Sequence, residues 1–314
     1  MALSPSGAGA QDRVVALNDA ARPSAGAALP RRIALPTGEL LVRHVRPDDA
    51  TALASLYDGL GMEGRATRFF TPKRPGASFF EHLASIADRG GAGIVAVQVS
   101  TPGGETGPIV GEASYELLEG GTGEMAITVD REWRGWLGAY LLASLSAVAA
   151  ARGLPNLEAR ILTRNPAMRA LTRARGEVYL PGSDWETVRV AFSTGGRMPG
   201  WSPTEDHPHV LLEMRGAPWA VLDGLRDAGY DVAACTGPAT RRCPLLEGDE
   251  CPLAAGADAI VLALPPDDRP DLLACAHAER HGDVPVTVIG PSAHRPITPD
   301  AVVDAVERAL EDRT

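Results

Sequence analysis

The sequence predicts an α/β protein built from two domains, and three observations support this fold class. The stretch from Gly123 to Leu142 reads as a short apolar strand, a glycine-containing turn and the start of an apolar helix. After residue 208, four short apolar runs alternate with three helix candidates, which is the pattern of a parallel sheet covered by helices. Between these two parts, residues 196–207 are rich in Pro and Gly and read as a linker.

These observations divide the chain into four parts. Residues 1–30 are rich in Ala, Gly, Ser and Pro and show no sustained periodicity, so we expect a disordered tail. Residues 31–195 should form the first domain and residues 208–314 the second, on either side of the linker at 196–207. At 314 residues, the chain is long enough for two domains that each have a core.

The negative charge is concentrated in the C-terminal part. The formal net charge is −10, and residues 193–314 hold 20 of the 40 acidic residues but only 10 of the 30 basic ones. This acidic part and the absence of a basic run argue against nucleic acid or an anionic membrane as a partner.

No apolar run has membrane-spanning length, and residues 1–30 lack the features of a signal peptide. We therefore expect a cytoplasmic protein, which could form a homo-oligomer.

Periodicity and turn residues place the elements of the first domain in order. Glu39–Val45 alternates like a strand, and Arg46–Asp49 ends this strand and caps the helix Ala50–Leu60. The further expected elements are the helix Phe79–Ala87, the antiparallel strands Ile94–Val99 and Ile109–Leu118, the helix Leu137–Arg152, the strand Leu157–Leu162, a helix capped by Asn165, and a hairpin of Glu177–Leu180 with Thr187–Ser193.

The turn after the strand that ends at Val129 is suited to an anion. Gly135 and Gly138 would let a bulky ligand come close to the backbone, and a turn of this kind directs backbone N–H groups at one point. The positive end of the following helix adds to the attraction. The ligand expected at this turn is therefore a phosphate group.

The phrase Glu124-Met-Ala-Ile-Thr-Val-Asp-x-x-Trp133-Arg134-Gly135 resembles the acetyl-CoA segment of the GNAT acetyltransferases. Within that superfamily it is most similar to the bacterial protein lysine acetyltransferases. The resemblance extends over roughly residues 38–195 and implies the GNAT fold, a mixed and largely antiparallel sheet with helices. One departure concerns the family's turn pattern, Gln/Arg-x-x-Gly-x-Gly/Ala. It matches Arg134–Ala139 only if one residue is deleted and Trp136 replaces a glycine.

The resemblance also implies an activity and a set of functional residues. The chain would transfer an acetyl group from acetyl-CoA directly to an amine, either on a protein lysine, which we expect, or on a small molecule. Glu124 would be the general base, Thr172 stands where the family has a tyrosine acid, and no metal is expected. The residues that would bind the cofactor are Ile127 and Val129 along the pantetheine arm, Arg134, Gly135, Trp136, Leu137, Gly138 and Ala139 at the pyrophosphate, and Asn165.

Alternatives stay open for this domain. Glu124 could be a solvent-facing glutamate at a strand end instead of a partly buried base. The domain could also be a non-catalytic sensor that binds acyl-CoA, because the Trp136 indole could fill the space of the missing glycine. The phrase Arg65–Phe70 lies where related acetyltransferases have an Arg-Phe-Phe phrase near the substrate entrance, although paired Phe residues favour helix packing.

The second domain resembles a shortened response-regulator receiver, which is a small flavodoxin-like parallel α/β domain. Its expected strands are Val210–Glu213, Asp231–Ala234, Ala259–Leu264 and Val284–Ile289, and its expected helices are Ala217–Ala228, Pro270–Arg280 and Pro299–Glu311. Ala263 stands at the phosphoacceptor place, and only Glu213 remains of the acidic pair that binds Mg²⁺ in receivers. We therefore expect a pseudo-receiver, which could regulate the first domain through contact or serve as a spacer or dimerisation module.

Three cysteines recur at a spacing of eight residues in this domain, and Cys243 and Cys251 each begin the phrase Cys-Pro-Leu. Metal motifs normally pair ligands two to four residues apart, and no histidine lies between Cys235 and Cys275. We expect small buried hydrophobic side chains, with a redox pair of Cys243 and Cys251 or a metal site as alternatives. The loop Cys235–Gly256 is long for a small α/β domain, so we expect any regulation of the protein to act through this loop.

Overall fold

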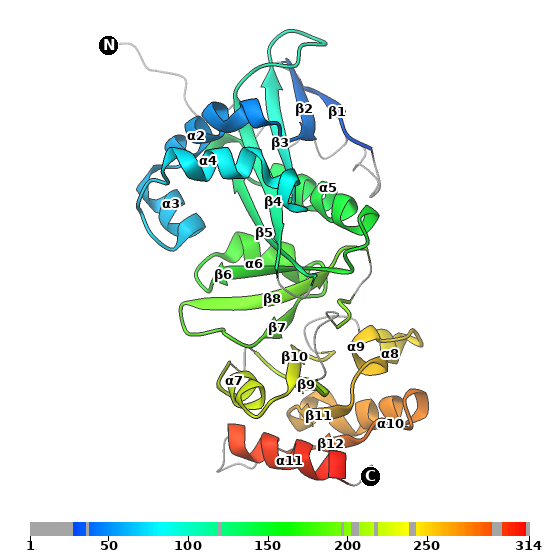
Figure 1. Ribbon diagram of the computed structural model, residues 1–314. Helices are drawn as coiled ribbons and strands as arrows, with labels where there is room; N and C mark the ends of the chain where they lie inside the picture. Colours follow the sequence, from blue (N-terminus) through cyan, green and yellow to red (C-terminus); the bar gives the residue numbers. More distant parts are fainter. Residues whose placement is uncertain are drawn as a thin grey trace, which may run out of the picture. The chain divides into compact units, whose positions relative to one another are not determined.

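The computed structural model describes residues 28–35, 38–118, 121–195, 198–201, 207–216, 219–238, 243–290 and 297–311 (Figure 1). The predicted tail at residues 1–30 and the predicted linker at residues 196–207 lie largely outside these ranges. The chain divides into two compact units, Met1–Leu118 with Gly123–Leu154 and Glu119–Thr122 with Pro155–Thr314. The domain boundaries expected from the sequence stay a prediction.

Among the described residues, the first unit has an antiparallel sheet in the order β1-β2-β3-β4-β5. The strands are β1 (Arg31–Leu35), β2 (Gly38–His44), β3 (Ala92–Val99), β4 (Ile109–Leu117) and β5 (Gly123–Val129). Apolar and β-branched residues fill β3 and β4, which are buried along most of their length. The sequence analysis did not predict β1, whose residues alternate between half-buried and exposed at the edge of this sheet.

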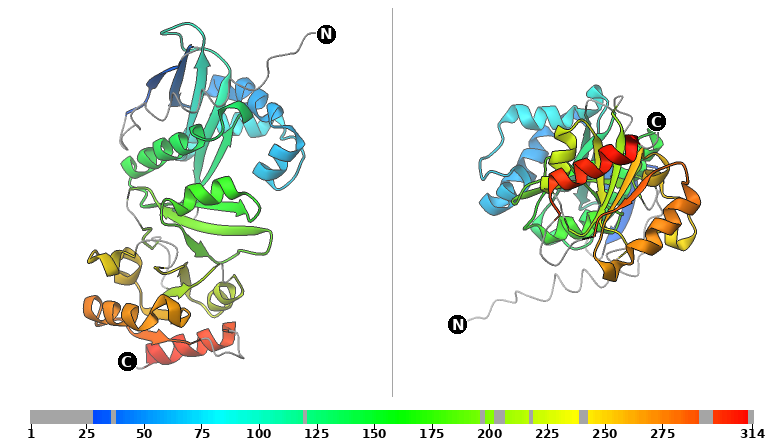
Figure 2. Two further views of the ribbon diagram at one scale, coloured as in Figure 1. Left: turned by 180° about the vertical axis from the view of Figure 1, so that it is seen from behind. Right: turned by 90° about the horizontal axis from the view of Figure 1, so that it is seen from below.

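Helices cover both faces of this sheet (Figures 1 and 2). They are η1 (Pro47–Asp49), α2 (Ala50–Gly59), α3 (Gly61–Phe69), α4 (Ala77–Ala84), η2 (Ile86–Arg89), η3 (Arg131–Trp133) and α5 (Leu137–Ala151). On one face α5 lies close to β4, because a Cβ on Gly111 would come within 2.9 Å of Leu141 and 3.0 Å of Leu137. On the other face α2 and α4 meet, where the rings of Tyr57 and Phe80 have centroids 5.5 Å apart.

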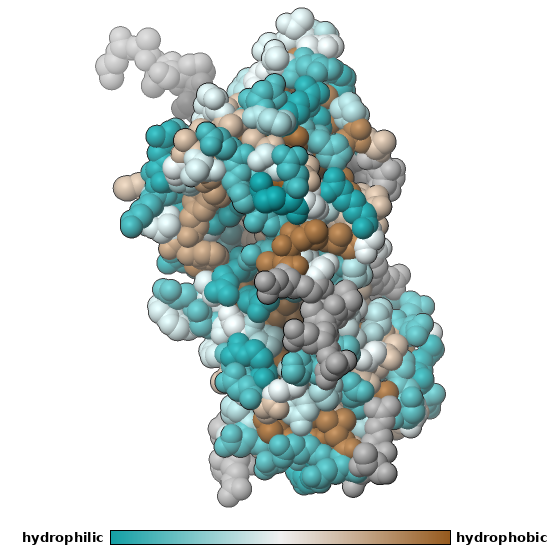
Figure 3. Space-filling view, in the orientation of Figure 1, coloured by the Kyte–Doolittle hydropathy of each residue, from teal (hydrophilic) through white to brown (hydrophobic). Residues whose placement is uncertain are grey.

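The end of α3 separates the two Phe residues of the Arg65–Phe70 phrase. Phe69 packs against the ring of Tyr57 at a centroid distance of 5.5 Å, as helix packing predicts. Phe70 is 47% exposed and ends the helix with a φ of 59°. Figure 3 shows hydrophobic residues gathered on the surface at the position of α3, whose Met62 is 71% exposed. Lys73, the only lysine of the sequence, is exposed in the connection between α3 and α4.

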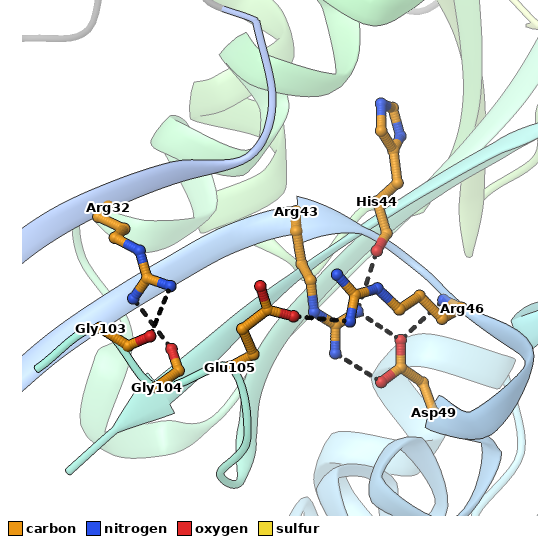
Figure 4. A network of polar contacts seen from close by, with 8 residues as sticks. All are labelled: Arg32, Arg43, His44, Arg46, Asp49, Gly103, Gly104 and Glu105. Carbon is orange, nitrogen blue, oxygen red and sulfur yellow. Dashed lines mark hydrogen bonds and ion pairs between the residues drawn. The ribbon is translucent and has the colours of Figure 1, made fainter. Parts of the chain in front are cut away.

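A buried ion pair joins β2 to the first helical turns (Figure 4). Arg43 Nη1 and Nη2 donate to the two carboxylate oxygens of Asp49 at 2.7 and 2.8 Å, and both side chains are buried. The backbone N–H of Arg46 donates to the same carboxylate at 2.8 Å. The hydrogen bond from Arg43 to Asp49 raises the pKa of Arg43 above its ordinary value. Asp49 is the N-cap of α2, but its carboxylate holds β2 and η1 rather than the amides of α2.

The strands of the second unit, over the residues that the structure describes, follow the order β6-β8-β7-β10-β9-β11-β12. They are β6 (Asn156–Leu162), β7 (Val178–Leu180), β8 (Thr187–Ser193), β9 (His209–Met214), β10 (Asp231–Cys235), β11 (Ala259–Ala263) and β12 (Val286–Val288). The neighbours β6, β8, β7 and β10 are antiparallel. The neighbours β10, β9, β11 and β12 are parallel, so these four lie in the order second, first, third and fourth along the chain.

Helices lie on both sides of these parallel strands. The helices of the second unit are α6 (Pro166–Arg173), α7 (Trp219–Asp227), α8 (Pro244–Glu247), α9 (Pro252–Ala255), η4 (Pro266–Asp268), α10 (Pro270–Arg280) and α11 (Pro299–Glu311). Leu245 of α8, Leu253 of α9 and Leu273 of α10 pack in one core with Leu211 and Ile260. The helices α7 and α11 lie side by side (Figure 2). The expected loop Cys235–Gly256 contains α8 and α9, which the sequence analysis did not predict.

We expect Arg43→Met to destabilise the first unit by about 3–5 kcal/mol, because the substitution leaves the carboxylate of Asp49 buried without its charged partner. Urea unfolding of the full chain, followed by circular dichroism, measures the change. Arg46→Met is the matched control, since Arg46 and Glu105 form an exposed pair at 3.2 Å that contributes about 0–1 kcal/mol. Equal losses in the two variants would contradict the role of burial.

Candidate active site

The segment between β5 and α5 forms an open turn. Asp130 follows β5, and its Oδ1 accepts a hydrogen bond from the backbone N–H of Glu132 at 2.9 Å, which starts η3. Trp133 at the end of η3 is buried, whereas Arg134 is exposed and has an extended backbone. Gly135 has a φ of 106°, and no atom lies within 4 Å of the position that its Cβ would occupy. Glycine is therefore required by the backbone here, and the space beside it is open.

The first turn of α5 follows directly. Its first hydrogen bond of the helical type runs from the N–H of Tyr140 to the carbonyl of Trp136 at 3.0 Å. The N–H groups of Leu137, Gly138 and Ala139 precede it and have no acceptor within the helix. Leu137 is fully buried and anchors the start of the helix, while Ala139 is exposed. The expected phosphate-binding residues thus lie on one continuous turn at the positive end of a 15-residue helix.

Trp136, which stands in the place of a glycine in the family pattern, packs against aromatic neighbours. Its ring centroid lies 6.3 Å from that of Trp133 and 6.2 Å from that of Tyr140. The indole is half-buried, and Trp136 is the N-cap residue of α5. Its ring is thus part of the packing at the start of this helix.

Residues Ile127 and Val129 lie on β5 opposite Ala113 and Gly111 of β4. Side chains alternate along a strand, so both point to the face on which α5 covers Gly111. Both residues are half-buried. The expected pantetheine-binding residues and the expected pyrophosphate-binding turn therefore belong to the same face and to consecutive elements.

Glu124 lies on the other face of β5. It is exposed, and its partner across the strands is Glu116 of β4. The partial burial expected from the sequence is wrong, because the apolar neighbours Met125 and Ile127 alternate to the opposite face. The charge of Glu124 acts on the guanidinium of Arg68 in α3 and helps to raise the pKa of that group. Its role as the base stays a prediction.

A buried polar cluster, which the sequence analysis missed, lies on the same face as Glu124. Glu112 of β4 is 0% exposed, and its Oε2 accepts a hydrogen bond from Tyr57 Oη at 2.9 Å. Ser114 and Arg68 also act on the Glu112 carboxyl. Thr128, which lies opposite Glu112 on the facing strand, also acts on the Tyr57 hydroxyl. The signal in the sequence that could have revealed this cluster was Glu112, an acidic residue inside an otherwise apolar part of an expected strand.

Burial controls the protonation of this cluster. It raises the pKa of Glu112 above its ordinary value, although the positive charge of Arg68 opposes the change. Burial also raises the pKa of Tyr57, and the charge of Glu112 adds to the effect. For Arg68, burial disfavours the charged form, but Tyr57 and Glu112 raise its pKa overall. The cluster therefore places the buried carboxyl group of Glu112 and the positive guanidinium of Arg68 on the same side of the sheet as the exposed carboxylate of Glu124.

The remaining expected residues belong to the second unit. Asn165 caps α6, and its Oδ1 accepts a hydrogen bond from the N–H of Met168 at 3.2 Å, as the sequence predicted for a cap. Thr172 is fully buried in α6, and its hydroxyl donates to the Glu177 carboxylate. The hydroxyl is therefore held inside this unit. The assignment of Asn165 to the cofactor stays a prediction.

In the ranges that the structure describes, no group of three or more His, Cys, Asp or Glu side chains could hold a metal ion. None of the described helices combines the length and the apolar character that crossing a membrane requires.

No protein-family model and no curated protein matches the chain. Among solved structures, the GNAT domain of S. lividans PAT is 26% identical and the likeness covers 52% of this chain and 96% of that one, with a TM-score of 0.45. A putative acetyltransferase from Salmonella typhimurium, solved with its cofactor acetyl-CoA, is 18% identical over 50% of this chain and 95% of that one, with a TM-score of 0.41. A cAMP-binding acyltransferase from Mycobacterium smegmatis is 21% identical over 64% of this chain and 57% of that one, with a TM-score of 0.37.

Other structures that are similar to this chain include a ribosomal-protein-S5-alanine acetyltransferase from Vibrio fischeri and a putative phosphinothricin N-acetyltransferase, with TM-scores of 0.39 each. These neighbours are acetyltransferases, and each likeness covers about half of the chain.

We expect Glu112→Gln to stabilise the first unit more at pH 7 than at pH 4. A carboxyl group whose pKa is raised by folding keeps its proton when the unfolded chain has already lost its own, so its contribution to stability falls as the pH rises above the ordinary value of 4.5. Glutamine has the same shape and does not titrate. Urea unfolding at the two pH values measures the difference, with Glu81→Gln at an exposed position of α4 as control. If the free energy of unfolding differed between the variant and the unchanged chain by the same amount at both pH values, the raised pKa of Glu112 would be contradicted.

Proposed function

We propose that this chain is an acetyl-CoA-dependent N-acetyltransferase of the GNAT type that acts on an amine by direct transfer, and that its acceptor is a protein lysine. The strand-turn-helix unit of β5 and α5 carries the proposal. An exposed carboxylate stands near the start of β5, and the same strand leads to an open glycine turn at the positive end of a 15-residue helix. This combination suits a cofactor with a pyrophosphate and a reaction that removes a proton from an amine.

The residues of the turn fit the pyrophosphate of CoA. Gly135 leaves open space beside its backbone, and the N–H groups of Leu137, Gly138 and Ala139 are available at the start of α5. Arg134 is exposed and adds a positive charge. When it is bound, acetyl-CoA supplies the activated acetyl group.

Glu124 would act on the amine. The amine nitrogen forms a bond to the carbonyl carbon of the thioester, and Glu124 takes the amine proton directly or through a water molecule. A backbone N–H of β5 would stabilise the negative charge on the thioester carbonyl oxygen during transfer. The CoA thiolate would be the leaving group and would take a proton from solvent. Thr172, at the family's tyrosine position, is engaged with Glu177 and is not proposed as an acid.

The second unit is proposed to contain a pseudo-receiver. The order of its parallel strands, second, first, third and fourth, is the one that flavodoxin-like folds use. At the carboxyl end of β9, Glu213 is paired with His277 at 3.1 Å, and at the end of β11 the last residue is Ala263. These residues support a domain that does not use receiver phosphotransfer. It would regulate the acetyltransferase or serve as a spacer or dimerisation module.

A non-catalytic acyl-CoA sensor is the second candidate, and Trp136 favours it. The half-buried indole packs between two aromatic rings at the turn where the family pattern has a glycine. If this ring restricts the pyrophosphate, the chain would bind acyl-CoA without turnover. Calorimetry with acetyl-CoA and an assay of transfer to lysine peptides distinguish the two. Binding with transfer supports the enzyme, binding without transfer supports the sensor, and no binding contradicts both.

We expect Glu124→Gln to lower turnover about a hundredfold or more, because the amide cannot accept the amine proton and one acid-base group usually contributes this much. The affinity for acetyl-CoA, measured by calorimetry, should stay nearly unchanged, since the turn and α5 are untouched. Glu116→Gln is the matched control, as Glu116 faces Glu124 directly across the strands and is also exposed. Full activity of the Glu124 variant would remove this residue from the mechanism.

A further inference from the structure

The second unit encloses a small cavity in which three of the four cysteines of the sequence come together. Its lining consists of Met198, Leu211, Glu213, Cys235, Gly237, Cys243, Pro244 and Cys251. All the cysteines are thiols, and Cys275, which is not part of the lining, is exposed on α10. The cavity belongs to one unit and does not involve the residues of the proposed acetyl transfer.

The repeated phrase Cys-Pro-Leu explains how two of these thiols reach the same cavity. Cys243 and Cys251 each have an extended backbone and stand directly before a single helical turn that begins with proline. The leucine of each phrase, Leu245 or Leu253, is buried in the core beneath α10. The two copies of the phrase therefore adopt the same local structure, in which the leucine anchors the turn and the cysteine lines the cavity.

The two thiols differ in their access to solvent. Cys243 is half-buried, so a small solute can reach it, whereas Cys251 is 5% exposed. Burial raises the pKa of the Cys251 thiol, and the nearby charges of Glu213 and Cys243 act in the same direction. Cys251 therefore stays protonated, and Cys243 is the thiol that meets a reagent from solvent first.

The third thiol has a different environment. Cys235 is the last residue of β10, and its Sγ accepts a hydrogen bond from the backbone N–H of Gly237 at 3.3 Å. This bond holds the sulfur at the end of its strand. Cys243 and Cys251, in contrast, each stand directly before a short helical turn, and only seven residues separate the two cysteines.

We propose that Cys243 and Cys251 form a reversible disulfide when the protein meets a hydroperoxide. The Cys243 sulfur attacks the peroxide O–O bond and becomes a sulfenic acid, and one molecule of water or alcohol leaves. The Cys251 sulfur then attacks the Cys243 sulfur, and the hydroxyl group leaves with the Cys251 proton as water. The two thiols lose two electrons in total, which the peroxide takes up. A dithiol reductant restores both thiols.

Buried Glu213 supports this order of events. Glu213 is 3% exposed and lines the cavity together with both cysteines, and its Oε1 is paired with His277 at 3.1 Å. Its Oε2 has no partner among the described residues. This oxygen can accept the Cys251 proton when that sulfur attacks, and it can pass the proton to the hydroxyl group that leaves.

The test treats the full chain with hydrogen peroxide and counts its thiols, which should fall from four to two and return to four with dithiothreitol. Trypsin leaves Cys243 and Cys251 on one peptide because no Lys or Arg lies between them, but cleavage at Glu247 or Glu250 separates them. A disulfide that links the two resulting peptides supports the proposal. A link through Cys235, or oxidation of Cys275 alone, overturns it.

Variants assign the two roles. Cys243→Ser and Cys251→Ser should each abolish the link, whereas Cys275→Ser, the matched control, should leave it intact. In Cys251→Ser, dimedone should label Cys243, and in Cys243→Ser it should leave Cys251 unlabelled. Labelling of Cys251 would overturn the assigned order. A stoichiometric Zn²⁺ that protects both thiols from peroxide in the purified chain would overturn the proposal as a whole.

Discussion

The register between β4 and β5 is the constraint on which the first unit depends. It places Glu116 opposite Glu124 and Gly111 opposite Val129, and each strand carries every second side chain to the same face. One face thereby receives Ile127 and Val129 beside α5, and the other receives the carboxylates of Glu112 and Glu124, which act on Arg68 of α3. A shift of the register by one residue would move each set of side chains to the opposite face. The same strand pairing therefore determines both the face expected to bind the cofactor and the face on which the expected base lies.

The first unit stabilises its buried carboxylates in two different ways. Asp49 is an ion-paired carboxylate, held by two hydrogen bonds from Arg43 and one from a backbone N–H. Glu112 is fully buried, accepts a hydrogen bond from Tyr57 and is also acted on by Arg68 and Ser114. The first arrangement ties a strand to a helix. The second places a buried carboxyl with a raised pKa inside the sheet, and groups with shifted pKa values are common at sites of function.

Much of the fold could be predicted because it follows from local patterns. The helix expected at Leu137–Arg152 is α5 at Leu137–Ala151, since apolar residues recur at helical spacing after a glycine turn. The strand β1 was missed because a half-exposed edge strand is defined by its neighbour rather than by its own residues. The turns α8 and α9 were missed because four residues are too few to show a period.

The sequence predicted which residues form the candidate site, but it predicted less well on which face of the sheet each side chain lies. The phrase from Glu124 to Gly135 located the strand, the turn and the helix start, which the structure places on consecutive elements. The exposure of Glu124 and the burial of Glu112 depend on which face each residue occupies, and this is decided by pairing with another strand. The burial expected for Glu124 was wrong because it was inferred from neighbours along the chain instead of neighbours across the sheet.

The single lysine of the sequence has a consequence for any enzyme that acetylates lysine. Lys73 is exposed between α3 and α4 and is the only lysine of the sequence, so under the proposed function it would be the only side-chain amine that the protein offers to its own reaction. Arginine provides the other positive charges, including those in the buried pairs, and its guanidinium is not an acceptor of this kind. Self-modification would therefore be confined to one surface position and the chain terminus, and the protein could work in a high concentration of acetyl donor without losing the charges that hold its fold together.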